Sequence, residues 1–215
     1  PAIVTWNGNV GVNDSALTSS ATSLTRAVGE TVAGSTYAIT AGSFTTPTTN
    51  YNAPTLVAGS TLAITPANLT ATVANQTKVY GANDPALAGV GVTLGGLINN
   101  PAIVTWNGNV GVNDSALTSN ATALTRAVGE GVAVRAITAG TFSAASANYS
   151  LPTLAGGSAL TITQAPLTAT VTQSKVYGAD DPALPFAVTS LNGLINNAAI
   201  VTWNGNVGVN DSALT

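Results

Sequence analysis

The sequence has no histidine, no cysteine and no methionine, and charged side chains make up only 6% of its 215 residues. The absence of cysteine excludes a disulfide framework. Acid–base and nucleophilic catalysis rely mostly on histidine, cysteine, lysine or paired carboxylates, and the only lysines here are Lys78 and Lys175. We therefore expect no catalytic residues, no cofactor and no enzymatic activity.

Basic residues are also too few for a nucleic-acid partner. The chain carries five lysine and arginine residues against eight acidic ones, a formal net charge of -3. Phosphate binding needs basic side chains gathered in a patch or stripe, so we expect no nucleic-acid binding. Low charge can also indicate a membrane protein, but no apolar run approaches the ~18 residues of a spanning helix. We expect no membrane insertion of this segment.

The most conspicuous feature that is present is an internal repeat. The stretch VTWNGNVGVNDSALT occurs three times without a substitution, beginning at Val4, Val104 and Val201. The stretch LTATV begins at Leu69 and again at Leu167, which gives a spacing of 167 − 69 = 98 residues. A period of this length is that of a small domain, because the rungs of solenoid proteins span only about 20–50 residues.

Prolines mark the boundary between successive repeats. Pro66 follows the alternating stretch 61–65, and Pro166 comes shortly after the alternating stretch 160–163; each stands just before the next LTATV stretch. Proline stops a strand ladder because it lacks a backbone donor. With this phase, residues 66–165 form a complete repeat unit, 1–65 the C-terminal part of a preceding unit, and 166–215 the N-terminal part of the next. We expect the chain to be a window of a longer array.

Within one repeat, short apolar–polar alternations are separated by turn residues about every ten positions, a pattern typical of β-proteins. Asp84–Leu87 and Asn113–Leu117 each indicate a single helical turn, with an acid or amide as cap. We therefore expect a mainly β fold of tandem small β-sandwich or β-grasp-like domains with at most single helical turns, arranged as beads on a string. The predicted strands are Leu69–Ala74, Val90–Leu94, Ala102–Trp106, Asn109–Val112, Thr122–Val128, Val132–Thr138, Asn148–Leu151 and Ala159–Thr163.

The repeated stretch contains a strong hairpin signal, Asn107-Gly108 between two apolar runs. A two-residue loop formed by this pair would turn Trp106 away from Val110 and Val112, whereas a three-residue loop, residues 107–109, would place the indole opposite Val110. We favour the three-residue loop with Trp106 in the core, because it buries more apolar area. The rival interpretation leaves the indole outside, so the candidate contact residues for a neighbouring chain or a sugar are Trp6, Trp106 and Trp203.

Several short motifs follow one another in the order seen in a known family. The motifs are LTAT at Leu69, Lys78-Val79-Tyr80-Gly81, Asp84-Pro85-Ala86-Leu87, Gly96-Leu97, Asp114-Ser115-Ala116-Leu117, Leu124-Thr125-Arg126 with Gly129-Glu130, Ala136-Ile137-Thr138-Ala139-Gly140, Asn148-Tyr149 and Leu160-Thr161-Ile162. In this respect the unit resembles the MBG-type repeat domains, with a Tyr-Gly motif, of large bacterial secreted and surface adhesins. The resemblance implies a non-catalytic module at the cell surface or outside the cell. The hairpin of residues 103–112 looks like an insertion in the pattern.

Two hypotheses concern ligands of the repeat, namely a calcium ion and a glycan. A calcium ion takes 6–8 oxygen ligands, and a site would need Asp84, Asp114 and Glu130 to converge. We favour the simpler interpretation that the two aspartates are caps and that Glu130 lies in a turn, so we expect no metal. Tyr80 and Tyr177 could stack on a glycan, but we favour a core tyrosine, because aromatic bulk usually lies inside.

Three functions fit these observations. The favoured one is a stiff spacer. Short linkers limit bending between units, and nearly identical units suit a protein in which the length of the array matters more than the chemistry of any one unit. The second is lateral self-association into an extracellular filament or biofilm matrix, because few charges protect the edge strands from pairing. The third is weak glycan binding strengthened by many copies. The expected partners are therefore the neighbouring repeats of the same chain, other copies of the chain in a fibre, and surface glycans.

Overall fold

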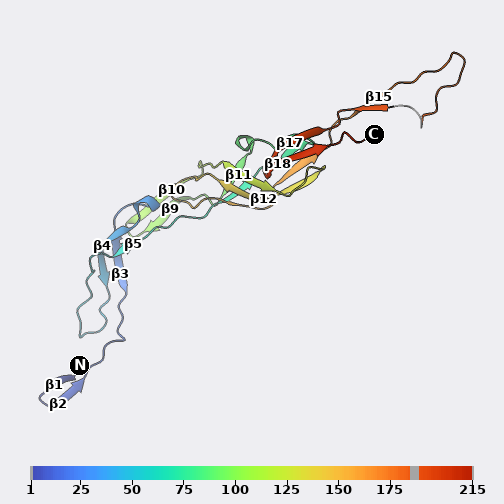
Figure 1. The fold of residues 1–215 in the computed structure, drawn as a ribbon. Helices are drawn as coiled ribbons and strands as arrows, with labels where there is room; N and C mark the ends of the chain where they lie inside the picture. The colour runs from blue at the N-terminus through green and yellow to red at the C-terminus, as the bar shows by residue number, and fades with distance from the viewer. Residues whose placement is uncertain (1, 185–188, 215) are drawn as a thin grey trace. The chain divides into compact units, whose positions relative to one another are not determined.

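The computed structural model describes residues 2–184 and 189–214. These residues form short β-strands in several small sheets, with two turns of 3-10 helix (Figure 1). The mainly β prediction is confirmed. The strands are β1 Ala2–Thr5, β2 Gly8–Gly11, β3 Ala21–Arg26, β4 Tyr37–Phe44, β5 Thr61–Leu62, β6 Thr70–Val73, β7 Gln76–Val79, β8 Val92–Gly95, β9 Asn99–Thr105, β10 Gly108–Asn113, β11 Ala121–Arg126, β12 Ala133–Phe142, β13 Thr153–Leu154, β14 Ala159–Thr163, β15 Thr168–Val171, β16 Thr189–Asn192, β17 Asn196–Thr202 and β18 Gly205–Asn210.

The helical turns lie elsewhere than the sequence suggested. The 3-10 helices are η1, Val32–Gly34, and η2, Leu87–Gly89. The turn predicted at Asp84–Leu87 is wrong, because the helix begins only at its last residue and no side chain caps it. The turn predicted at Asn113–Leu117 is not helical in the described structure, since Asn113 Oδ1 instead accepts hydrogen bonds from the backbone and hydroxyl of Ser115.

The chain forms two compact units, and the chain order is interleaved between them. The first consists of residues 1–66 and 98–115, and the second of residues 67–97 and 116–215. One division between the units falls after Pro66, beside the proline-marked seam of the sequence repeat. The units nevertheless differ from the contiguous segments 1–65, 66–165 and 166–215 of the sequence repeat, because the hairpin β9–β10 joins the unit formed by the preceding repeat. The chain therefore passes between the units three times.

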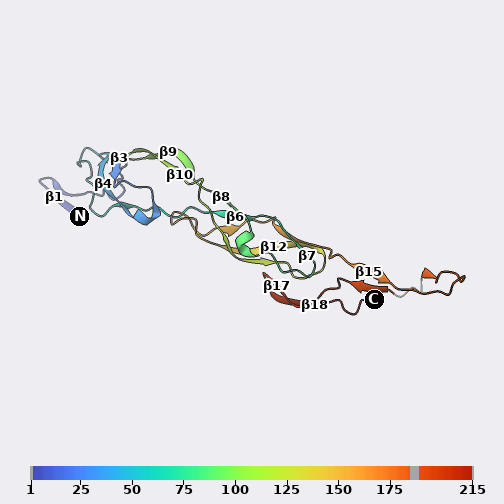
Figure 2. The same ribbon diagram turned by 90° about the horizontal axis from the view of Figure 1, so that it is seen from above.

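The second unit contains two sheets that share a core. One has the strand order β11-β12-β14-β7 and the other β13-β6-β8, and Figure 2 shows β6 and β8 side by side. β14 pairs parallel to β7, and β13 parallel to β6. Of the two predicted architectures, this is a sandwich, since core side chains come from both sheets: Ala71, Val73, Val90, Ala121, Leu124, Ile137 and Phe142.

The alternation of residue types explains which faces these strands bury. In β6 the sequence Thr-Ala-Thr-Val buries Ala71 and Val73 and leaves both threonines exposed. In β14 Leu160 and Ile162 are buried between less covered neighbours. Successive side chains of a strand point to opposite faces, so the threonine hydroxyls cover the outside of the sandwich.

The first unit repeats part of this arrangement with a thinner core. Its sheet has the order β3-β4-β5. The register of β3 with β4 matches that of β11 with β12, since Leu24 pairs with Gly42 as Leu124 does with Gly140. Leu24, however, is only half-buried, whereas Leu124 is buried.

The hairpin loop differs from both predicted registers. Thr105 pairs with Gly108, so Trp106 and Asn107 form the loop and the indole sits at its tip. The Thr105 hydroxyl accepts a hydrogen bond from Asn107 N at 3.1 Å and donates one to Gly108 O at 2.6 Å. Gly108 has a φ of +107°, a conformation open to glycine. The two hydrogen bonds of the Thr105 hydroxyl close the two-residue loop, and they set the register in place of the apolar pairing on which the three-residue loop was predicted.

Candidate functional site

Within the second unit, the hairpin β17–β18 packs onto the sandwich through the tryptophan at its tip. The indole nitrogen of Trp203 donates a hydrogen bond to Pro85 O at 2.9 Å. The ring packs against the hydrophobic core cluster of the sandwich, beside a groove lined by Leu87, Thr122 and Leu124. Trp203 belongs to the next sequence repeat, so one repeat contributes a core side chain to the repeat before it.

The loop before η2 runs along the first strand of this hairpin. Asp84 N donates to Val201 O at 2.9 Å, and Val201 N donates to Asn83 Oδ1 at 2.8 Å. Trp203 N donates to Asp84 Oδ2, also at 2.9 Å. One main-chain bond and two side-chain bonds therefore hold β17 beside this loop, without a further strand pair among the described residues.

An asparagine side chain holds the hairpin tip to the end of β11. Asn204 Oδ1 accepts from Arg126 N at 3.0 Å, and Asn204 Nδ2 donates to Arg126 O at 2.7 Å. The first unit has the same pair of bonds, from Asn107 to Arg26 at 3.1 Å and 2.6 Å. The amide thus satisfies both backbone groups of a residue at a strand end, which would otherwise lack partners.

Four charged side chains form a buried cluster under this contact. Lys78 Nζ lies 2.8 Å from Asp84 Oδ1 and 2.5 Å from Glu130 Oε2. Arg126 Nε lies 2.7 Å from Asp84 Oδ2, and Arg126 Nη2 pairs with Glu130 Oε1. All four side chains are at most 7% exposed. Two cations and two anions cancel, which is the condition for burying charge at tolerable cost.

The cluster sets the protonation state of Asp84. Burial alone would raise the pKa of this carboxyl, but hydrogen bonds from Arg126, Lys78 and the backbone of Trp203 outweigh it, so the pKa lies below its ordinary value. For Arg126, burial would lower the pKa, and the bonds to Asp84 and Glu130 raise it above the ordinary value. Both groups are therefore charged at neutral pH.

These contacts correct the sequence-based interpretation of the acidic residues. Asp84 is not a helix cap but a partner of two cations and of the hairpin backbone. Asp84 and Glu130 do converge, yet Lys78 and Arg126 occupy the space between them, and Asp114 belongs to the first unit. Among the described residues, no group of three or more acidic, histidine or cysteine side chains could hold a metal ion.

The Tyr-Gly motif makes a second contact with the same hairpin. Tyr80 is half-buried, and its hydroxyl donates to Asp211 Oδ1 at 3.1 Å. Burial, and then this bond, raise the pKa of the phenol. Gly81 has a φ of +81°, and a Cβ there would lie 2.6 Å from the side chain of Ile195. The expectation that Tyr80 is a core residue is therefore wrong. Position 81 requires glycine, because its φ is positive and because a Cβ would clash with the side chain of Ile195.

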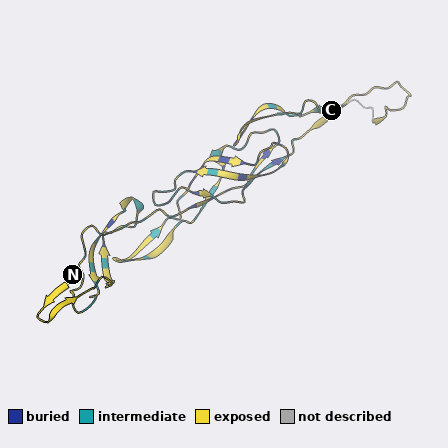
Figure 3. Cartoon of the chain, turned by 60° about the horizontal axis from the view of Figure 1, so that its bottom comes forward, coloured by how far each residue is buried: buried dark blue, intermediate teal, exposed yellow. Residues whose placement is uncertain are grey.

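The three identical copies of the hairpin lie in three environments. Trp6 is 106% exposed, Trp106 is 45% exposed, and Trp203 is partly buried against the core. The registers at the tips are the same, since Thr5 pairs with Gly8 and Thr202 with Gly205. Figure 3 draws β1 and β2 as exposed along their whole length. The burial of the indole is therefore decided by what the hairpin meets and not by its own sequence.

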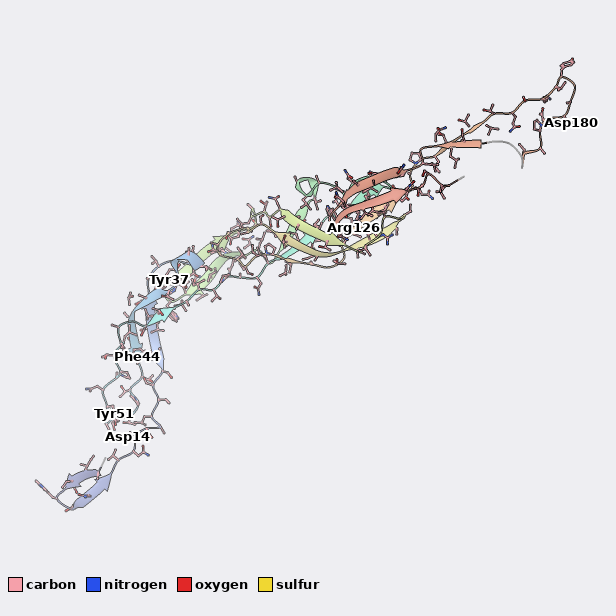
Figure 4. The ribbon with its side chains drawn as sticks, viewed as in Figure 1. Asp14, Tyr37, Phe44, Tyr51, Arg126 and Asp180 are labelled. Carbon is pink, nitrogen blue, oxygen red and sulfur yellow. The ribbon has the colours of Figure 1, made fainter. Side chains whose placement is uncertain are left out.

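Sequence reasoning missed the cluster and the asparagine contact, although a signal was present. In a chain with 6% charged residues, Arg126 and Glu130 recur as Arg26 and Glu30 (Figure 4 labels Arg126). The pair Lys78 and Asp84 recurs as Lys175 and Asp181, which lie 2.6 Å apart. The recurrence of rare charges at matching positions was the signal for a shared structural role.

Residues 69–161 match the model of the MBG domain (YGX type). This segment is an MBG domain. The match contains the whole charge cluster, the Tyr80-Gly81 pair and the hairpin tip at Trp106 and Asn107. One MBG domain thus carries both a surface that receives a hairpin and a hairpin that packs elsewhere.

MBG domains are a non-catalytic type of module and typical of surface proteins, which agrees with the expected adhesin-like repeat. No curated protein and no solved structure matched the chain. Within the described residues, no helix has the length and apolar character that crossing a membrane requires.

Proposed function

We propose that these MBG domains are links of a stiff extracellular spacer, in which each domain clamps the one before it with its hairpin. The observation that carries the proposal is the position of residues 98–115. They lie in the middle of the second repeat but belong to the compact unit of residues 1–66. Within the second unit, the hairpin β17–β18 packs in the same way onto the sandwich that the preceding repeat forms.

The connectivity supports stiffness. Domains joined by one linker move relative to each other by default, whereas here three chain passages connect the units. Release of the hairpin β9–β10 from the first unit would break the two Asn107–Arg26 hydrogen bonds. Each such bond contributes about 0.5–1.5 kcal/mol net, which supports the proposal that the hairpin stays docked.

Little in the repeat suggests that individual units have separate tasks. The fifteen residues of the hairpin segment are identical in all three copies, and the contact of Asn204 with Arg126 repeats that of Asn107 with Arg26. Identical links are what a spacer needs, because its function is length. We infer a place between a cell-surface anchor and a more distant adhesive part.

Distance measurements between two spin labels test the clamp. The chain has no native cysteine, so Ala41→Cys in β4 and Ala139→Cys in β12, both exposed positions, label one unit each. We expect a narrow distance distribution that broadens when Asn107→Ala releases the hairpin. The matched control is Asn7→Ala, the same residue in the exposed copy, which should change nothing. A broad distribution in the parent chain would overturn the proposal.

A further inference from the structure

We propose that the buried charge cluster is the site of a covalent bond, an amide that joins Lys78 Nζ to Asp84 Cγ. A lysine ammonium and an aspartate carboxylate condense to an amide and one molecule of water, so the reaction needs no oxidant, cofactor or second protein. The amide fastens strand β7 to the loop that contacts the hairpin β17–β18. The proposal does not rest on the spacer function, because it concerns a cluster within the second unit.

The two reacting groups are held in contact with each other. Lys78 Nζ lies 2.8 Å from Asp84 Oδ1, and both side chains are buried. Lys78 is fixed by the pairing of β7 with β14, and Asp84 by the hydrogen bond from its backbone N to Val201 O. Groups fixed side by side react as parts of one molecule, at an effective concentration far above any in solution. The fold therefore supplies the encounter that free side chains lack.

Glu130 is placed to carry protons during the reaction. Its Oε2 atom accepts a hydrogen bond from Lys78 Nζ at 2.5 Å, and its Oε1 atom pairs with Arg126. An ammonium must lose a proton before its nitrogen can attack a carboxyl carbon. A carboxylate within hydrogen-bond reach of that nitrogen can take the proton and return it later. We assign this acid–base role to Glu130.

Two donors hold the oxygen of Asp84 on which negative charge remains during the attack. Arg126 Nε donates to Asp84 Oδ2 at 2.7 Å, and Trp203 N donates to the same atom at 2.9 Å. Donors fixed in this way stabilise the oxyanion of a tetrahedral intermediate. Among the described residues, no backbone N–H donates to the carboxylate of Glu130. The arrangement therefore selects Asp84 as the acceptor, and the docked hairpin completes the site through Trp203.

Atoms and charges balance in this step. The bond between Lys78 Nζ and Asp84 Cγ forms, and the bond between Cγ and Oδ1 of Asp84 breaks. Two of the three ammonium protons leave Nζ by way of Glu130 and depart with Oδ1 as water, while Oδ2 becomes the amide oxygen. Glu130 ends ionised and paired with Arg126, as it began. The buried site thus keeps one cation and one anion, which still cancel.

The ion-paired cluster is the state of the chain before condensation. Hydrogen bonds keep Asp84 ionised there, and an ionised carboxylate is attacked slowly, so the amide forms after the chain has folded. Once formed, the amide lies in a site that excludes water, which its hydrolysis requires. Condensation also removes Asp84 as a titrating group. The acid sensitivity that Asp84 confers therefore belongs to the ion-paired state.

Mass spectrometry of the full chain tests the bond. After prolonged storage of the folded protein at neutral pH, the chain, denatured for the measurement, should be lighter than its sequence by one molecule of water. Trypsin does not cut after an acylated lysine, so residues 27–126 should stay in one fragment that carries this loss. Lys175→Met is the matched control, because Lys175 lies 2.6 Å from Asp181 at the surface. This variant should lose one water molecule, as the parent does.

The variant Glu130→Gln tests the proton carrier. Glutamine has nearly the same size as glutamate but cannot take up the proton, so this variant should keep its full mass over the same storage. If Glu130→Gln unfolds the chain, Glu130→Asp replaces it, because the shorter side chain withdraws the carboxylate from Lys78 Nζ and should slow the loss of water at least tenfold. Loss of water at the parent's rate in the folded variant would overturn the role of Glu130.

Two results would overturn the bond itself. One is a parent chain that keeps its full mass after storage while circular dichroism shows it to be folded. The other is a loss of water in a branched fragment that contains residues 127–135, which would place the bond at Glu130 instead of Asp84. Neither result changes the distances that the spin labels report, so failure of the amide leaves the spacer proposal to its own test.

Discussion

The side chain of Asn107 donates a hydrogen bond to the carbonyl of Arg26, 81 residues earlier in the chain, and accepts one from its amide. Asn204 does the same with Arg126 over 78 residues. In both places an amide from one repeat completes the end of a strand in the repeat before it. The unit of folding is therefore not the unit of sequence. Each domain is finished by the hairpin of its successor.

The three tryptophans provide a stability test with built-in controls. Trp203→Ala should lower the free energy of unfolding of the second unit by about 2–3 kcal/mol, somewhat below the usual cost for a fully buried aromatic. Trp106→Ala should cost less, and Trp6→Ala, at an exposed position, should stay within about 0.5 kcal/mol. Urea unfolding of the three variants gives the order. Equal losses at all three positions would contradict the docking model.

The buried charge cluster should be far more sensitive than the same pair at the surface. Lys78→Met leaves Asp84 and Glu130 with Arg126 as their one remaining cation, and breaking a buried pair costs about 3–5 kcal/mol. Lys175→Met is the matched control, because the side chains of Lys175 and Asp181 are 47% and 85% exposed and exposed pairs contribute about 0–1 kcal/mol. Thermal unfolding measures both. A similar effect of the two substitutions would show that burial does not matter.

Acid should weaken the second unit through Asp84. The pKa of this carboxyl is lowered in the folded state, so its stabilising contribution is complete above the unfolded value of about 3.9. The contribution is lost as the pH falls from there through the lower, folded pKa. Melting curves between neutral pH and pH ~2 should show this loss, and Asp84→Asn should flatten it. Asp181→Asn, at an exposed position, should not.

Tyr80 offers a milder test of the hairpin contact. Tyr80→Phe removes the hydrogen bond to Asp211 and should cost about 0.5–1.5 kcal/mol. The pKa of Tyr80 is raised in the folded state, so this contribution is present below about pH 10 and disappears as the pH rises through the folded pKa. Tyr177→Phe should have no effect, because Tyr177 is 103% exposed. An alkaline profile unchanged by Tyr80→Phe would argue against the contact.

The sequence alone was sufficient for the class of fold and for the family. Strand alternation is local information, because the order of polar and apolar residues in Thr70–Val73 is enough to predict which side chains point inward. The repeat and the order of its motifs were enough to predict an MBG-type domain. The hairpin was predicted as well, but its register was not, because the choice depended on the Thr105 hydroxyl bonds to Asn107 and Gly108 rather than on apolar pairing.

Only the tertiary structure decided what the hairpin and the charges do. Lys78 and Glu130 are 52 residues apart, and Trp203 bonds to a carbonyl 118 residues away, so no pattern of neighbouring letters brings them together. Trp6 and Trp203 stand in the same fifteen-residue stretch, yet one is exposed and the other packs on a core. Identical sequence cannot specify different burial. The difference comes from the surface that each hairpin meets, and that surface is assembled only when distant strands of the chain have folded together.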